Sequence, residues 1–201
     1  MTYRHTKLVE YLNTTLKTHL IFDFDETLCK LILPWDQCFN EIKKILYKAN
    51  PDILKRYEYH EISLSELQNL YVIHSHGELK KQFIESLTYF ETRFLSDVIP
   101  NEELIKFVKN NNRYTLYIWS SNTRSTILSS LTRCGIETSF NHIIGMEDVL
   151  LLKPEPDGFE KIYRESILKT QYLFLGDSSH DKRAAISAGI DFMHINYFHD
   201  A

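Results

Sequence analysis

The feature that most constrains the fold is an alternation of helical and strand-like segments in the second half of the chain. Short apolar segments rich in β-branched and aromatic residues alternate there with segments whose apolar residues recur at helical spacing. The predicted strands cover residues 114–120, 142–145, 172–175 and 192–195, and the predicted helices cover residues 102–108, 126–133, 159–166 and 182–188. This alternation predicts an α/β fold, a Rossmann-like three-layer core in which a parallel sheet has helices on both faces.

A second, all-helical unit interrupts this core near its start. A short helix at about residues 7–16 and a buried strand at residues 20–24 precede it, and four amphipathic helices then follow without an intervening strand. Asn50-Pro51 and the capping-box pattern Ser63-Leu-Ser-Glu66 mark the starts of two of these helices. We therefore predict a core domain made of residues 1–29 and 98–201, and an inserted helical domain made of residues 30–97.

The composition narrows the classes of partner. The 201 residues carry a formal net charge of −4 and a pI near 6.1, which gives no general attraction to nucleic acid or to anionic membranes. No apolar segment is long enough to cross a bilayer, and the first residues do not resemble a secretory signal. The cysteines, Cys29, Cys38 and Cys134, are odd in number and lack zinc-site spacing. We expect a cytoplasmic monomer or homodimer without nucleic-acid or membrane partners.

Two carboxylates follow the first buried strand at a spacing of two residues. Asp23 and Asp25 end the segment Leu20-Ile-Phe-Asp-Phe-Asp, and an extended backbone would direct both side chains to one side. Because an unpaired carboxylate is costly to bury, two of them at a strand end suit a metal ion or acid–base chemistry. Taken alone, the pattern also fits a strand that leaves the core into an acidic turn.

The later strands of the core also end in polar side chains, and parallel sheets bind ligands beyond the carboxyl ends of their strands. Ser120-Ser121-Asn122 can hold an anion or cap the next helix. Lys153, in a proline-rich loop, can neutralise phosphate charge or remain solvated. A further strand ends in Gly176-Asp177, four residues before Asp181. Carboxylates that converge from two strands require a cation between them, and oxygen-only ligation suits Mg²⁺.

Four motifs thus occur in order, each at the end of a predicted strand. They are Asp23-Phe-Asp25-Glu-Thr27, Leu116-Tyr-Ile-Trp-Ser-Ser121-Asn122, Lys153-Pro-x-Pro-x-x-Phe159 and Gly176-Asp177-x-x-x-Asp181. This series resembles the haloacid dehalogenase superfamily, in its phosphatase branch, whose first motif is Asp-x-Asp-x-Thr. The helical insertion directly after the first motif is similar to the C1 cap of that family, which closes over the nucleophile.

The resemblance implies a role for each acidic residue. Asp23 would be the nucleophile and would form an aspartyl-phosphate, and Asp25 would be the general acid and then the base that activates water. Mg²⁺ would be held by the Asp23 carboxylate, the Asp25 backbone carbonyl and Asp177, with Asp181 in support.

The resemblance also implies which residues bind substrate. Ser121 would hydrogen-bond a phosphate oxygen, and Lys153 would offset the charge of the nucleophile and the phosphate together. Asn122 is also assigned to substrate binding, although both Asn122 and Thr27 suit capping or turn roles as well. Glu26 departs from the glycine that is common at this position in cap-bearing phosphatases of the family.

The activity implied is that of a Mg²⁺-dependent phosphatase acting on the phosphate monoester of a small organic metabolite. Asp25 favours phosphate esters over halides, because members that resemble dehalogenases lack the second aspartate. Two alternatives stay open: a phosphomutase acting on a sugar phosphate, and a catalytically silent binding or regulatory module with the same fold. Helical periodicity does not reveal which cap residues face the site, so the sequence leaves the substrate undefined.

Overall fold

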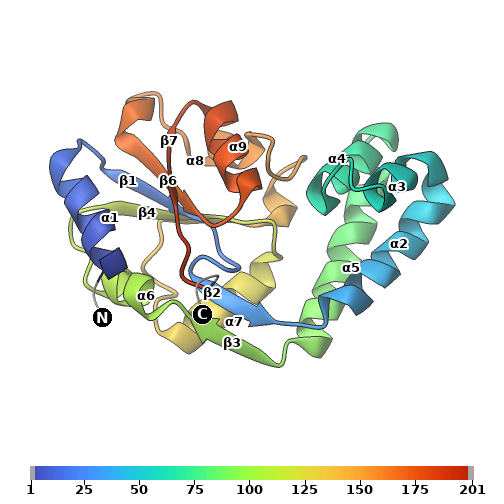
Figure 1. The fold of residues 1–201 in the computed structure, drawn as a ribbon, viewed down its shortest axis with the longest axis horizontal. Coiled ribbons are helices and arrows are strands. Elements are labelled where there is room, and N and C mark those ends of the chain that lie inside the picture. Colours follow the sequence, from blue (N-terminus) through green and yellow to red (C-terminus); the bar gives the residue numbers. More distant parts are fainter. Residues whose placement is uncertain (1–2, 199–201) are drawn as a thin grey trace.

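The computed structural model describes residues 3–198, which form two lobes (Figure 1). One lobe is a five-stranded sheet with helices on both sides, and the other consists of the four helices α2–α5. Residues that directly follow three of the strands line a cavity together with residues of the helical lobe. The architecture is therefore an α/β core with a helical cap over the carboxyl ends of its strands.

The sheet is parallel throughout, and its first strand lies at the centre. The strands run in the order β5-β4-β1-β6-β7. Their bounds are β1 (His19–Phe22), β4 (Thr115–Trp119), β5 (His142–Ile144), β6 (Tyr172–Gly176) and β7 (Asp191–His194). Ile21 in β1 lies opposite Tyr117 on one side and Phe174 on the other. Because helices cover both faces, the central strands are apolar on both faces, as the sequence predicts.

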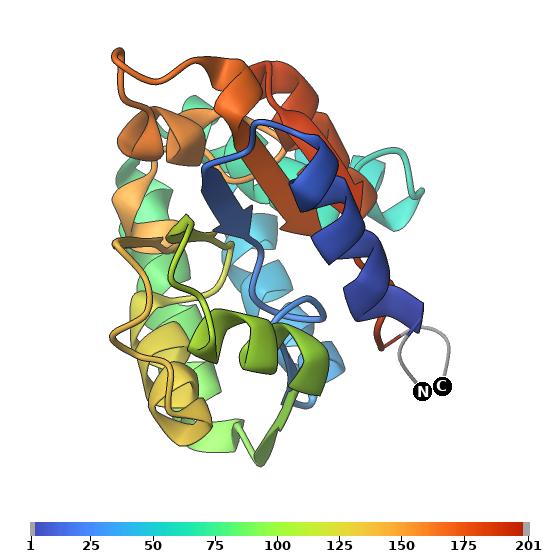
Figure 2. The same cartoon turned by 90° about the vertical axis from the view of Figure 1, so that its left-hand side faces the viewer.

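Successive residues of β1 point into two separate apolar cores. Leu20 and Phe22 belong to the core formed with α1, α6 and α7, whereas Ile21 belongs to the core formed with α8 and α9. The helices are α1 (Tyr3–Thr14), α6 (Glu102–Lys109), α7 (Arg124–Cys134), α8 (Asp157–Ile162) and α9 (Ser179–Ala188). Figure 2 shows α6 and α7 below the strands and α8 and α9 above them. The predicted three-layer core is confirmed.

The helical lobe contains the four helices expected after the first motif. They are α2 (Trp35–Ala49), α3 (Pro51–Glu58), α4 (Leu64–His74) and α5 (Glu78–Phe94). The Asn50 side chain caps α3 by accepting from the backbone N–H of Asp52 at 3.1 Å, and Ser63 and Glu66 form the predicted capping box of α4. The start signals in the sequence therefore predict these helix boundaries correctly.

A two-stranded ribbon joins the lobes. β2 (Cys29–Ile32) and β3 (Asp97–Pro100) pair in antiparallel fashion, with Cys29 opposite Pro100 and Ile32 opposite Asp97. The sequence predicts no strand in either segment. Each is only four residues long, and the whole helical lobe separates them, so no hairpin turn marks the pairing. The predicted domain limits after residues 29 and 97 fall within this ribbon.

The helix predicted at residues 159–166 differs from the structure. α8 begins two residues earlier and ends at Ile162, and Tyr163 leaves the helix with a ψ of 139°. Two short 3₁₀ helices, η1 (Met146–Asp148) and η2 (Lys169–Gln171), were also not predicted. Apolar spacing alone does not fix the end of so short a helix, because Tyr163 and Ile167 beyond it still pack partly against the core.

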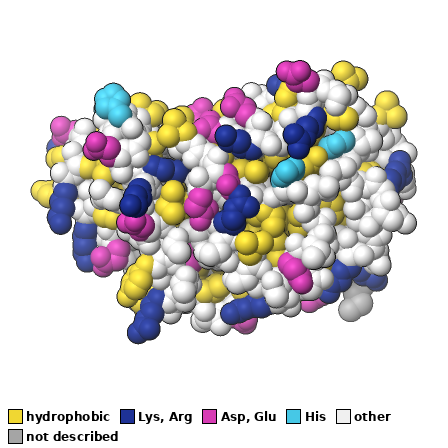
Figure 3. Space-filling model, turned by 180° about the vertical axis from the view of Figure 1, so that it is seen from behind, with side chains coloured by type: hydrophobic (Ala, Val, Ile, Leu, Met, Phe, Trp, Pro, Cys, Tyr) yellow, Lys and Arg dark blue, Asp and Glu magenta, His cyan; other side chains and the backbone are white. Residues whose placement is uncertain are grey.

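On the face shown in Figure 3, acidic and basic side chains are interspersed, and the basic ones form no continuous area. This distribution agrees with the small net charge of the chain. In the part of the chain that the structure describes, none of the helices has both the length and the apolar character needed to span a bilayer.

Candidate active site

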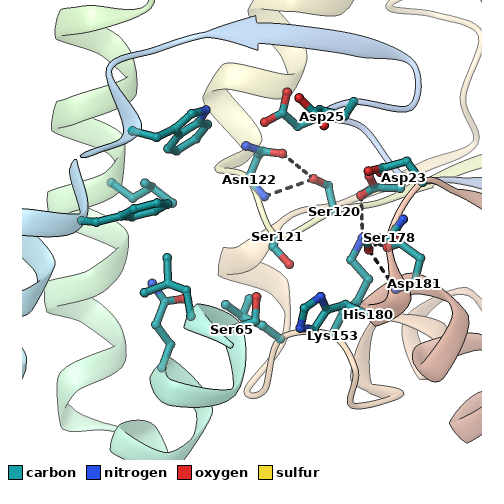
Figure 4. Close-up of a pocket in the computed structure, with 18 of the residues that line it drawn as sticks. Asp23, Asp25, Ser65, Ser120, Ser121, Asn122, Lys153, Ser178, His180 and Asp181 are labelled. Carbon is teal, nitrogen blue, oxygen red and sulfur yellow. Dashed lines mark hydrogen bonds and ion pairs between the residues drawn. The ribbon is translucent and has the colours of Figure 1, made fainter. Parts of the chain in front are cut away.

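A cavity of about 540 Å³ lies between the carboxyl ends of β1, β4 and β6 and the cap helices (Figure 4). It is lined by every site residue proposed from the sequence: Asp23, Asp25, Ser121, Asn122, Lys153, Asp177 and Asp181. This volume is within the range of about 300–1,000 Å³ that is typical of small-molecule sites. The fold therefore brings residues from four separate motifs to one place.

Asp23 directly follows β1 and forms hydrogen bonds with β6 and with the loop that follows Asp23. Its backbone N–H donates to the carbonyl oxygen of Leu175 at 2.8 Å. The buried hydroxyl of Thr27 lies 3.3 Å from Asp23 Oδ2 and 3.1 Å from Asp177 Oδ1. Thr27 thus links the carboxylates of two motifs, a role that the turn and capping interpretation of this residue does not include.

Lys153 lies between two of the carboxylates. Its side chain is 5% exposed, and Nζ lies 2.5 Å from Asp23 Oδ1 and 2.5 Å from Asp181 Oδ1. Burial alone would lower the pKa of Lys153, but the two carboxylates outweigh burial and raise that pKa above its ordinary value. Lys153 is therefore a fixed positive charge beside Asp23, and the solvated alternative is excluded.

Asp181 holds Lys153 and also caps α9. Its Oδ2 accepts from the backbone N–H of Ser178 at 3.0 Å and from the Ser178 hydroxyl at 2.6 Å, while Oδ1 accepts from Lys153. Burial tends to raise the pKa of Asp181, but Lys153 and Ser178 outweigh burial and lower it. Gly176 allows this close packing, because a Cβ there would lie 2.6 Å from the Asp181 side chain.

The acidic group is more negative than one lysine can balance. Oxygen atoms of Asp23, Asp177 and Asp181 all lie within 4.8 Å of one another. Burial raises the pKa of Asp23 and the charge of Asp181 raises it further, while Lys153 opposes both effects. A divalent cation at these oxygens would favour the ionised form of Asp23, and an all-oxygen set suits Mg²⁺. The residues present therefore fit such an ion.

Asp25 lies apart from this group, above Ser120 and Asn122 in Figure 4. Its Oδ1 accepts from the backbone N–H of Leu31 at 2.8 Å. Burial raises the pKa of Asp25 to about 7, against the lowering effect of that hydrogen bond. Burial thus raises the pKa of both acids of the first motif, and what distinguishes them is their partners. Asp23 has Lys153 beside it and belongs to the oxygen group where a divalent cation would favour its ionised form, whereas Asp25 has no cationic partner among the described residues and retains a proton near neutral pH.

The backbone at Glu26 adopts a conformation that favours glycine. Glu26 has a φ of 61°, in the left-handed region that costs a residue with a Cβ about 1 kcal/mol. Its carboxylate lies 3.0 Å from Lys30 Nζ. The left-handed turn directs the chain from Asp25 back toward β2.

The Ser120–Asn122 loop has one free hydroxyl among its side chains. Ser120 Oγ donates to Asn122 Oδ1 at 2.8 Å, and Asn122 Nδ2 donates to Glu91 Oε1 at 3.3 Å. The amide oxygen and the amide nitrogen of Asn122 therefore both have hydrogen-bond partners. Ser121 lines the cavity and makes no side-chain hydrogen bond within the described residues, so its hydroxyl can bind an anion.

Two cap residues that the sequence motifs do not include form hydrogen bonds with loops of the core. Asn69 in α4 donates to the carbonyl oxygen of Leu152 at 2.8 Å and accepts from the Leu152 N–H at 2.7 Å. Glu91 in α5 is fully buried and accepts from Asn122 and from the Thr123 hydroxyl. Glu91 lies four residues after Leu87 and thus on the apolar side of its helix, where a charged residue signals an internal partner.

Comparison with known proteins identifies the family. Residues 20–195 match the haloacid dehalogenase-like hydrolases, and the chain belongs to that family. Pyrophosphatase PpaX from Halalkalibacterium halodurans is 28% identical over 103 residues, which cover 50% of this chain and 48% of that protein. The match thus spans about half the length of that relative.

Solved structures support the fold. A protein from Bacteroides fragilis, described as a candidate haloacid dehalogenase-like hydrolase, has a TM-score of 0.61 at 22% identity, with 92% of this chain and 90% of that chain covered. A predicted phosphoglycolate phosphatase from Haemophilus somnus has a TM-score of 0.56 at 22% identity, with 92% and 87% covered. Both likenesses extend over most of this chain and therefore support its overall fold.

Proposed function

We propose that this hydrolase is a Mg²⁺-dependent phosphatase that cleaves the phosphate monoester of a small organic metabolite. The observation that carries the proposal is the contrast between the two acids of the first motif. Burial raises the pKa of both acids, but Asp23 lies 2.5 Å from Lys153 and in the oxygen group where a divalent cation would hold it ionised, whereas Asp25, with a pKa of about 7, has neither partner. An ionised nucleophile beside a protonated acid is what ester cleavage through a covalent intermediate requires.

In the first step, a carboxylate oxygen of Asp23 attacks phosphorus, and the bond from phosphorus to the ester oxygen breaks. Asp25 gives its proton to that ester oxygen, so that the alcohol leaves neutral. Lys153 offsets the charge of Asp23 and of the phosphate together, and the free hydroxyl of Ser121 donates to a phosphate oxygen. The product of this step is an aspartyl-phosphate at Asp23.

In the second step, water attacks the phosphorus of the aspartyl-phosphate. Asp25, now ionised, takes a proton from that water, and the bond between phosphorus and Asp23 breaks. Inorganic phosphate leaves, and both acids return to their starting states. The cap helices lie over the strand ends, where they would limit the access of other water molecules.

For Mg²⁺ we propose the Asp23 carboxylate, the backbone carbonyl of Asp25 and Asp177 as protein ligands. Asp181 would support the site by holding Lys153 through Oδ1, while its Oδ2 accepts from the Ser178 hydroxyl. The bound ion would offset repulsion between the carboxylates and the phosphate and stabilise charge on the transferring group. A cytoplasmic location and a monomeric or homodimeric state stay predictions from the sequence.

The test is hydrolysis of p-nitrophenyl phosphate with Mg²⁺. We expect activity that EDTA abolishes and Mg²⁺ restores, and that Asp23→Asn abolishes. Asp52→Asn is the matched control, since it makes the same chemical change at a carboxylate that is 84% exposed on α3. Activity that persists in Asp23→Asn or in EDTA would contradict the mechanism.

A further inference from the structure

The cap side of the cavity presents a mainly apolar and aromatic surface. Trp35, Phe39 and Ile42 of α2 line it, together with Leu87 of α5. The Trp35 and Phe39 rings stack with centroids 6.0 Å apart and planes 22° apart. Aromatic side chains that face a cavity favour planar or apolar ligand groups over strongly hydrated ones.

The cavity offers little positive charge to a second anionic group. Among the described residues that line it, Lys153 is the only lysine or arginine, and both Asp23 and Asp181 already bind it. His180 also lines the cavity, with Nε2 3.9 Å from the Glu66 carboxylate. The carboxylates on the lining are Asp23, Asp25, Glu26, Asp177 and Asp181. Asp25 is the protonated acid of the proposed mechanism and Glu26 is paired with Lys30, so one divalent cation and Lys153 only balance Asp23, Asp177 and Asp181. No positive charge on the lining is then left for a second anionic group.

The side-chain amide of Gln68 in α4 is a polar group on the cap side of the cavity. The residue is 5% exposed and its side chain makes no hydrogen bond to any described residue. Its amide atoms are not among the fully buried polar atoms, so a ligand in the cavity can reach them. A neutral amide offers both donors and an acceptor, which suits a carbonyl, amide or hydroxyl group of a ligand and offers no charge to a carboxylate or phosphate.

We propose that the leaving group of the substrate is uncharged, with a planar ring that packs against Trp35 and Phe39 and a hydrogen-bonding edge that meets Gln68. This inference rests on the proposed phosphatase function. It disfavours substrates whose leaving group carries a second anion, including pyrophosphate and phosphoglycolate, which the names of the similar proteins suggest.

The test compares two phosphate esters that differ only in the charge of the distal group. 4-Carbamoylphenyl phosphate and 4-carboxyphenyl phosphate are nearly isosteric, so the ratio of their kcat/KM values isolates the charge. We expect the carbamoyl ester to be favoured about tenfold or more, because like charges placed close together discriminate strongly. Pyrophosphate and 2-phosphoglycolate are measured beside them, with p-nitrophenyl phosphate as the general phosphatase substrate.

A charge introduced at the proposed contact should change this preference. We expect Gln68→Lys to shift the ratio toward the carboxylate ester by about tenfold. Gln82→Lys makes the same change at an exposed position on α5 and should leave the ratio unaltered. The wild-type ratio tests the proposal even if Gln68→Lys does not fold.

The outcomes separate the two proposals. Hydrolysis of p-nitrophenyl phosphate with preference for the carboxylate ester, pyrophosphate or phosphoglycolate would overturn the substrate inference alone. A shift with Gln82→Lys as large as with Gln68→Lys would overturn it as well. Absence of Mg²⁺-dependent hydrolysis of every ester would overturn the proposed function and the inference that rests on it.

Discussion

Replacing Asp25 with asparagine isolates the proposed proton transfer. The substitution removes the acidic proton but keeps an oxygen at the position that accepts from Leu31 N–H at 2.8 Å. It therefore changes the chemistry of the side chain with little change in its shape or contacts. A substrate whose leaving group needs a proton should lose much more activity than one whose leaving group departs readily as an anion.

The magnitude follows from the environment of Asp25. Its pKa rises from the ordinary 3.8 to about 7, which corresponds to about 4 kcal/mol of added cost for ionising the side chain. About half of the molecules then carry the proton at pH 7. General acid catalysis contributes about 100- to 10,000-fold. We expect Asp25→Asn to lower kcat/KM by that factor for benzyl phosphate and by about tenfold or less for p-nitrophenyl phosphate.

The assay measures kcat/KM for both esters with wild type and with Asp25→Asn. This ratio reports only the steps up to the formation of the aspartyl-phosphate, so the later role of Asp25 as a base does not enter. Asp52→Asn again serves as the control for an exposed carboxylate. Equal losses with the two esters would refute the reasoning, because they would show that Asp25 supports the structure of the site and gives no proton.

Three further predictions concern pH, charge and the cap. For benzyl phosphate, kcat/KM should fall as the pH rises through about 7, because Asp25 must be protonated to act; a pH profile of Asp25→Asn should lack this fall. Lys153→Met should abolish activity. It should also lower the free energy of unfolding by about 3–5 kcal/mol, because it leaves the buried carboxylates of Asp23 and Asp181 without their positive partner. Urea titration measures this loss of stability. Asn69→Ala should lower that free energy by about 1–3 kcal/mol, because both polar groups of the Leu152 backbone lose their partner, and thermal melts would detect the change.

The sequence predicts the core of the site because the strand ends are chemically distinctive. Asp23 and Asp177 each directly follow a buried strand, and a parallel sheet brings such ends together. Lys153 instead lies in the loop beyond β5, which ends at Ile144, so the strand-end prediction is wrong for this residue although it lines the same cavity. Asp25 does not point to the same side as Asp23, as an extended strand would require. β1 ends at Phe22, and the chain then turns through Glu26, so Asp25 lies apart from the carboxylate group although it lines the same cavity.

Long-range pairing accounts for most of what the sequence does not predict. Three features depend on how the cap folds back over the core. They are the β2–β3 ribbon, the hydrogen bonds between the Asn69 side chain and the Leu152 backbone, and the position of Gln68 at the cavity. Periodicity identifies the apolar side of a helix but gives no information about which polar residue faces a neighbouring lobe. Glu91 is the exception, because a carboxylate on an apolar stripe requires a buried partner.

The most direct test of the central claim is chemical trapping of the aspartyl-phosphate. The Asp25→Asn variant is mixed with p-nitrophenyl phosphate and Mg²⁺, quenched, and reduced with borohydride, which converts an aspartyl-phosphate to homoserine. Tandem mass spectrometry then locates the modified residue. The mechanism predicts homoserine at position 23 and its absence in Asp23→Asn. Phosphate trapped on Ser121 or another side chain, or turnover with Asp23 unmodified, would contradict it.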